Sequence, residues 1–286
     1  MEIIPLYQGK RKNILVISGG GIKGFAALGA IKSLMEQEII VYPEIFCGTS
    51  VGSILCFLLC IGYGPIDIFN VISNINLTKL INYVDPDNLF FDPCFGFSTS
   101  DSFITVISGF MKSKNINKNI TFKDLFQKTN SKLIITGTCV NTQSIKYFSV
   151  DETPDMEVLI AIQISISIPF VFKPVIYDNC IWVDGACMNN FPIDLFNDKI
   201  DDVIGIYLAI SPSTCHEINE VQDYFTRILK CINKGLDLIK LEFYKKHIVY
   251  IKTNAKSDID WEITQDTKKY LFDIGYKTAL EYLNNL

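Results

Sequence analysis

Apolar runs and helical segments alternate from the start of the chain. Residues 13–18 form a short β-branched run that stops at three glycines, and residues 23–37 then carry apolar side chains at helical spacing. The order repeats, with a buried strand expected at residues 45–47 and a helix, apolar on every side, at residues 51–61. Consecutive strand–turn–helix units predict a parallel sheet with helices on both faces.

Further strands and helices are expected along the rest of the chain. Residues 65–111 are predicted to be helical except for an interruption at 85–100, to which the pattern assigns no regular structure. Residues 175–177 and 181–183 flank an Asp178-Asn179 turn as a hairpin, which places Asp184 at the end of a strand. The other expected strands are 132–141, 146–150, 203–209 and 248–252, and the other expected helices are 217–244 and 264–285.

Composition narrows the class of protein. Of the 286 residues 49% are hydrophobic and 20% charged, which is typical of a folded globular chain. The net charge of −5 and the lack of a basic stripe disfavour nucleic-acid binding. The apolar runs at 14–17 and 54–61 are too short for a signal peptide or a membrane span, which needs about 20 residues. Nine scattered cysteines, without zinc-site spacing, favour free thiols in a reducing compartment, so a cytoplasmic location is expected.

A serine between two glycines is the strongest chemical signal. Gly48, Ser50 and Gly52 form the pattern GxSxG, and Thr49 and Val51 fill its variable positions. A sharp turn between a strand and a helix pushes such a serine hydroxyl outward, and glycines fit that turn best. The helix that starts behind it adds partial positive charge near a developing anion. Ser50 is therefore a candidate nucleophile.

A glycine-rich segment precedes that elbow by about one strand–helix unit. Its backbone N–H groups could converge on the oxyanion of a substrate. A dinucleotide-binding loop is the alternative for such a pattern, but it calls for an acid at the end of the next strand, and Glu44 stands before that strand instead. A phosphate-binding P-loop fails because Phe25 occupies the lysine position. The candidate oxyanion-hole residues are Gly19, Gly20, Gly21, Ile22, Lys23 and Gly24.

The third candidate catalytic motif is a carboxylate next to two small residues. Asp184 is followed by Gly185 and Ala186, which would let another loop approach closely. A carboxylate with the reference pKa of about 3.9 is a poor base for serine, so activation requires burial to raise that pKa. The apolar neighbours Ile181 and Trp182 favour such burial.

Only two histidines, His216 and His247, are present. A conventional triad would need one of them, and the order Ser50, Asp184, His216 matches that of the α/β-hydrolases. His216 stands in a polar stretch typical of a surface loop, which favours a solvated histidine. A triad esterase that uses His216 stays open as the alternative, as does a catalytically silent binding protein.

Taken together, these motifs resemble those of the patatin-like phospholipases. That family combines a glycine-rich oxyanion loop, a GxSxG elbow and an aspartate in DGA or DGG. The resemblance runs from about residue 14 to about residue 196. It also rests on TFKDL at 121–125, LIITGT at 133–138, SIPFVFKPV at 167–175 and NNFP at 189–192.

The resemblance implies a three-layer α/β/α sandwich with a mostly parallel central sheet. Residues 14–197 would form the acyl-hydrolase core, and 198–286 would add strands and helices to the same domain. Ser50 and Asp184 would act as a dyad without histidine, metal or cofactor, and the amides of Gly20 and Gly21 would hold the oxyanion. Lys23 stands where many relatives carry arginine, and we expect it to solvate a helix rather than take part in catalysis.

The substrate implied by the resemblance is a phospholipid or a neutral lipid. Contact with a membrane surface as a peripheral protein is expected on the same basis. The aromatic residues Phe90, Phe91, Phe95 and Phe97 are candidates for the border of an acyl entrance, with ordinary core packing as the alternative. Head-group preference and oligomeric state stay open.

Overall fold

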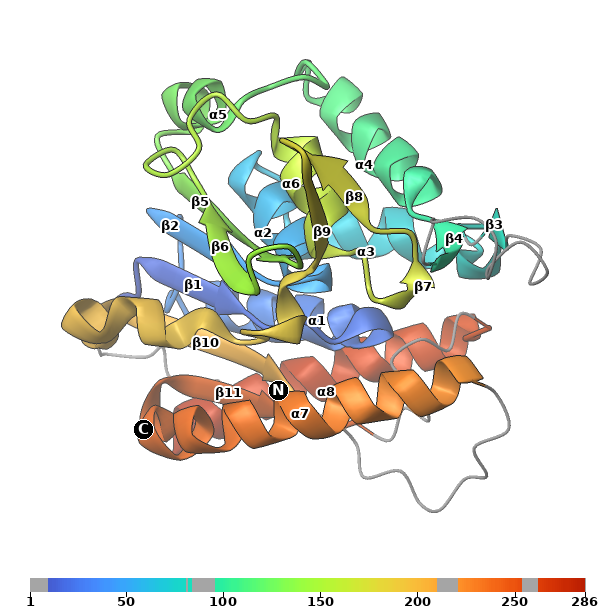
Figure 1. The fold of residues 1–286 in the computed structure, drawn as a ribbon. Coiled ribbons are helices and arrows are strands. Elements are labelled where there is room, and N and C mark those ends of the chain that lie inside the picture. Colours follow the sequence, from blue (N-terminus) through green and yellow to red (C-terminus); the bar gives the residue numbers. More distant parts are fainter. Residues whose placement is uncertain (1–9, 81, 84–95, 210–220, 254–261, 286) are drawn as a thin grey trace.

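The computed structural model describes residues 10–80, 82–83, 96–209, 221–253 and 262–285. An eight-stranded sheet lies at its centre, in the order β11-β10-β1-β2-β5-β9-β8 with β6 paired to β5 (Figure 1). The five strands from β11 to β5 are mutually parallel, and β9 runs antiparallel to β5. The strand bounds are β1 (Ile14–Ile17), β2 (Ile45–Gly48), β5 (Lys132–Cys139), β6 (Ser144–Phe148), β8 (Val175–Tyr177), β9 (Cys180–Asp184), β10 (Val203–Leu208) and β11 (Ile248–Ile251).

Helices pack on both faces of this sheet, which confirms the predicted three-layer architecture (Figure 1). One face carries the larger core, formed with α1, α2 and α8. A short irregular helix, η5 (Pro192–Asp202), and the end of α7 cover the other face. The helix bounds are α1 (Gly24–Glu36), α2 (Val51–Cys60), α3 (Pro65–Ser73), α4 (Asp101–Ser113), α5 (Phe122–Thr129), α6 (Val158–Ser165), α7 (Val221–Phe243) and α8 (Gln265–Asn284).

The first strand shows why its sequence is continuously apolar. Leu15 and Ile17 point into the larger core, whereas Ile14 and Val16 point into the smaller one. A strand covered by helices on both faces has no solvent side, so alternation of polar and apolar residues is absent. The predicted hairpin is also confirmed, since β8 and β9 pair around Asp178 and Asn179, both with positive φ.

The segment between residues 65 and 111 departs from the prediction. Part of the predicted interruption is a strand, β4 (Gly96–Thr99), which pairs with β3 (Asn82–Tyr83) and with β7 (Phe170–Phe172) in a second, small sheet. The parallel partner of β4 lies more than 70 residues away along the chain. Local periodicity carries no information about such a distant pairing, which explains why the strand was not predicted. Residues 84–95 lie outside the described part of the chain.

Two further comparisons concern helices. The predicted helix 217–244 is confirmed over the described range of α7, and residues 217–220 lie outside it. The pattern did not predict α6, in which six of the eight residues are apolar and most are buried. Within the described ranges, no helix combines the length and the apolar composition needed to cross a bilayer.

Candidate active site

The strand register brings Ser50 and Asp184 to the same level of the sheet. Gly48, the last residue of β2, pairs with Ile135 on β5, and two residues further along β5 Gly137 pairs with Asp184. Both side chains are buried, and Ser50 lies close enough to the Asp184 carboxyl group to lower the pKa of that group. The fold therefore joins the candidate nucleophile to the candidate base across 134 residues of sequence.

The turn at Ser50 has the geometry of a nucleophile elbow. Ser50 has φ 54° and ψ −127°, an unfavourable conformation for a residue with a side chain. The neighbouring glycines permit it, because a Cβ on Gly48 would lie 2.4 Å from the Gly52 carbonyl and one on Gly52 would lie 2.3 Å from the Ile17 oxygen. The Ser50 N–H donates to Ser165 Oγ at 2.9 Å, which fixes the turn against α6.

Gly19, Gly20 and Gly21 line the same pocket as Ser50 and Asp184. The Gly19 N–H is already engaged, since it donates to the Asn190 carbonyl at 3.2 Å. A Cβ on Gly19 would lie 3.2 Å from Ser50 Cβ, so the loop lies directly against the nucleophile. Gly21 has φ 54°, which favours glycine. This placement leaves Gly20 and Gly21 as the candidate amide donors.

The other three residues of the predicted oxyanion segment have different surroundings. Ile22 and Gly24 line an apolar cavity on the other side of Ser50. Lys23 was expected to solvate a helix, and this prediction is wrong because its side chain is fully buried. The Lys23 ammonium donates to the carbonyl of Ala209 at 2.7 Å and to that of Leu208 at 3.4 Å, at the end of β10. Lys23 thus ties the glycine loop to the neighbouring strand.

Burial raises the pKa of Asp184 to about 7. Two interactions act in the opposite direction, the hydrogen bond from the Ala186 N–H to Asp184 Oδ1 at 2.8 Å and the nearby Ser50 side chain. Gly185 is required beside it, because a Cβ there would lie 2.1 Å from Thr136 Oγ1. Thr136 in turn donates to Thr49 Oγ1 at 2.8 Å, so the elbow and the DGA loop are held together through β5.

An apolar cavity of about 120 Å³ starts at Ser50. A single water needs roughly 10–15 Å³, so this space is far more than a packing defect. Among the described residues that line the cavity, Ser50 is the one with a polar side chain, and most of the others come from α2, α3, α4 and the segment after α6. Sequence analysis missed these residues, whose apolar pattern is that of ordinary core helices. The aromatic side chains predicted to border an acyl entrance, at 90, 91, 95 and 97, lie outside the described part of the chain.

The histidines do not add a described partner for the dyad. His216 lies outside the described residues. His247 precedes β11, at the amino-terminal edge of the parallel strands, whereas Ser50 follows the carboxyl end of β2. Burial lowers the pKa of His247, and Lys12 beside it acts in the same direction. Within the described ranges, no group of three or more histidine, cysteine or acidic side chains could hold a metal ion.

The fold and these residues define a class of protein. The chain matches the family "Patatin-like phospholipase" over residues 15–197, which is more than half of its length. The chain therefore belongs to the patatin-like phospholipase family.

Two viral proteins and one solved structure illustrate the relationship. The chain is 32% identical to the uncharacterized protein R571 of Acanthamoeba polyphaga mimivirus, over 95% of this chain and 94% of that protein. It is 37% identical to the probable lipid hydrolase 463L of Invertebrate iridescent virus 6, over 63% of this chain and 62% of the relative. The structure of VipD from Legionella pneumophila superimposes with a TM-score of 0.66 at 17% identity, over 97% of this chain and 67% of VipD, which shows the shared fold.

Proposed function

We propose that this protein is a lipid acyl hydrolase with Ser50 as nucleophile and Asp184 as general base. One observation carries the proposal. Ser50 lies at the junction of two spaces, an apolar cavity and a polar pocket that contains Asp184 with a pKa near neutrality. A base with a pKa close to the working pH is well matched to proton transfer.

The proposed reaction has two stages. Ser50 Oγ attacks the ester carbonyl and its proton passes to Asp184, while the amides of Gly20 and Gly21 bind the oxyanion. The C–O bond to the alcohol breaks, and Asp184 returns the proton to the leaving oxygen. A water molecule then loses a proton to Asp184 and attacks the acyl-enzyme, which releases the fatty acid and restores Ser50. The chemistry requires no metal.

The apolar cavity supports a fatty-acyl chain as the part of the substrate that binds there. Membership of the family and the likeness to the probable lipid hydrolase 463L support a phospholipid or a neutral lipid as the whole substrate. We also propose that residues 14–197 hold the catalytic core and that 198–286 complete the same domain, since β10 and β11 extend its sheet beyond β1. A cytoplasmic location with peripheral membrane contact is part of the same proposal.

The experiment uses a fluorophosphonate probe together with hydrolysis of p-nitrophenyl esters and phospholipid vesicles. Ser50→Ala should abolish labelling and lower hydrolysis by about 10⁴-fold or more. Asp184→Asn should lower hydrolysis by about 10²–10⁴-fold, because the amide cannot accept the proton. Ser113→Ala on α4 and Asp273→Asn on α8 are matched controls at exposed positions and should behave as the wild type.

The pH profile is the second readout of this experiment. Asp184 acts as a base only when ionised, so kcat/KM should rise with pH and level off above about 7. A profile without that rise, or full labelling in Ser50→Ala, would contradict the dyad. Loss of turnover in His216→Ala would favour the triad, and folded protein that never reacts with the probe would favour a silent binding role.

A further inference from the structure

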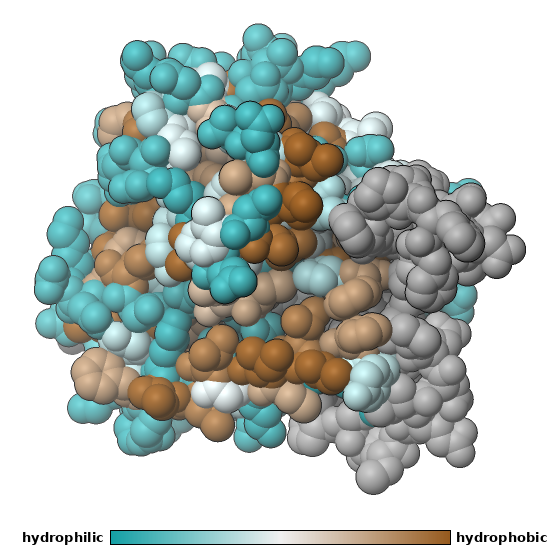
Figure 2. Space-filling model, in the orientation of Figure 1, coloured by the Kyte–Doolittle hydropathy of each residue, from teal (hydrophilic) through white to brown (hydrophobic). Residues whose placement is uncertain are grey.

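Helix α7 carries its apolar side chains on the side that faces solvent. All of these residues except Leu238 recur at three- and four-residue spacing along its 23 residues, and Ile239 and Phe243 are 79% and 76% exposed. In Figure 2 a band of brown, hydrophobic residues lies over the position of α7 in Figure 1. The outer face of α7 consists of Tyr224, Ile228, Ile232, Leu236, Leu238, Ile239 and Phe243.

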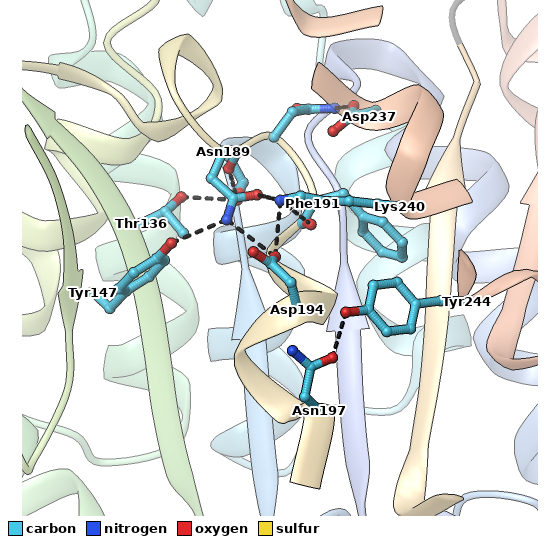
Figure 3. A network of polar contacts seen from close by, with 11 residues as sticks. Thr136, Tyr147, Asn189, Phe191, Asp194, Asn197, Asp237, Lys240 and Tyr244 are labelled. Atoms are coloured by element: carbon cyan, nitrogen blue, oxygen red, sulfur yellow. Dashed lines mark hydrogen bonds and ion pairs between the residues drawn. The ribbon is translucent and has the colours of Figure 1, made fainter. Parts of the chain in front are cut away.

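The opposite side of α7 attaches the helix to the protein mainly through polar side chains, and Leu241 packs against the smaller core. Lys240 forms an ion pair with Asp194 at 2.8 Å and donates to Asn189 Oδ1 at 2.7 Å (Figure 3). The buried Asp237 accepts hydrogen bonds from the Tyr207 hydroxyl at 2.9 Å and from the Asn190 amide at 3.4 Å. An amphipathic helix in a globular protein normally turns its apolar side to the core. In α7 most of the described apolar side chains face solvent instead.

The outer face continues to the mouth of the active site. Phe225 of α7 stacks on Phe170, with ring centroids 4.1 Å apart, and the neighbours Ile168 and Pro169 line the pocket of Ser50. Leu229 and Asn233 of α7 line the same pocket. Whatever covers the outer face therefore lies beside the entrance to Ser50.

The charges of α7 favour an anionic surface as the covering partner. Arg227 and Lys234, seven residues apart, lie along one flank of the outer face, and Lys230 between them lines the pocket of Ser50. Among the described side chains of the helix, Asp237 points inward and Glu242 is paired with Lys245 at 2.7 Å. Among the described side chains of α7, basic residues therefore outnumber acidic ones, although the whole chain has a net charge of −5.

We propose that the outer face of α7 binds the surface of an anionic phospholipid bilayer, with the helix parallel to the membrane plane. A helix of 23 residues is about 34 Å long, and its apolar side can enter the boundary between head groups and acyl chains while its basic flank meets lipid phosphates. This orientation turns the pocket of Ser50 toward the bilayer that supplies the substrate. The inference rests on the proposed acyl-hydrolase function.

The test measures co-sedimentation with phosphatidylcholine vesicles, with and without phosphatidylserine. Ser50→Ala serves as the parent protein so that the lipid is not consumed. The double variant Ile239→Asp, Phe243→Asp should lower binding to the anionic vesicles by roughly tenfold or more. Ile176→Asp is the matched control, because Ile176 on β8 is also 79% exposed and lies away from α7. When the same double substitution is made in the protein that keeps Ser50, it should abolish hydrolysis of vesicles but leave hydrolysis of p-nitrophenyl butyrate unchanged.

A site-specific probe separates lipid from a protein partner. Tryptophan emission of Phe243→Trp should shift to the blue on anionic vesicles and be quenched by brominated acyl chains, and that of Ile176→Trp should not change. Equal vesicle binding by the α7 variant and the control would overturn the proposal. It would also be overturned if the protein were a dimer that the α7 substitutions dissociate. The two proposals can fail independently. Absence of fluorophosphonate labelling would overturn the catalytic proposal, whereas the vesicle-binding test uses Ser50→Ala protein and does not depend on catalysis.

Discussion

The two long carboxy-terminal helices are attached to the protein in opposite ways. Helix α8 packs against α1 so closely that a Cβ on Gly275 would lie 1.8 Å from the Ala26 oxygen, and it buries Leu271 and Ala279. Helix α7 buries Asp237 and holds Lys240 in an ion pair, while its apolar side faces outward (Figure 3).

This difference separates two uses of an amphipathic helix. The apolar side chains of α8 are buried in the larger core, so α8 contributes to the free energy of folding. Most of the apolar surface of α7 remains exposed to solvent in the folded protein and can contact a partner. Directional polar contacts then decide how α7 is oriented, because hydrogen bonds and ion pairs specify a geometry that apolar contacts alone do not.

The largest expected difference in stability between the two helices comes from shortening an apolar side chain to alanine. Leu271→Ala on α8 should lower the free energy of unfolding by about 2–5 kcal/mol, since it removes buried methyl groups and leaves a cavity. Ile239→Ala on α7 should change it by less than about 0.5 kcal/mol, because the side chain is already in water. Urea unfolding of both variants measures the difference, and equal losses would contradict the contrast between the helices.

The second largest effect concerns polar side chains, and here the substitution in α7 should cost more stability than the one in α8. Asp237→Ala on α7 should cost about 1–3 kcal/mol, because Tyr207 and Asn190 lose their acceptor in a buried place. Asp273→Ala, at an exposed position of α8, should change stability by less than about 0.5 kcal/mol. Thermal unfolding at neutral pH compares the two. A larger loss in the α8 variant would show that polar contacts do not hold α7.

The smallest expected effect is an increase in stability. Apart from its own turn of helix, no described residue comes within 4 Å of a Cβ placed on Gly235 of α7. Gly235→Ala should therefore raise the free energy of unfolding by about 0.5–1 kcal/mol through the higher helix propensity of alanine. A loss of stability, measured in the same urea titration, would mean that another part of the chain covers this position.

Much of the architecture followed from local patterns. The strand, glycine and helix units around Gly19 and Ser50 were recognisable locally, because Gly48 and Gly52 are required by close backbone approaches and Gly19 lies directly against Ser50. The hairpin that ends at Asp184 also followed from its turn residues. The second sheet was not predictable, since β4 and β7 are brought together only by the fold.

The tertiary structure decided what surrounds these residues. The environment of Lys23 depends on the end of β10, almost 190 residues away, and the pKa of Asp184 depends on burial by several elements. The spacing of apolar residues in α7 determines a helix with two unlike faces, but the periodicity is the same whichever face turns inward. Contacts with Asn190, Asp194 and Tyr207 made that choice, because the pairing of polar groups over long sequence distances depends on the packed chain and not on any local segment.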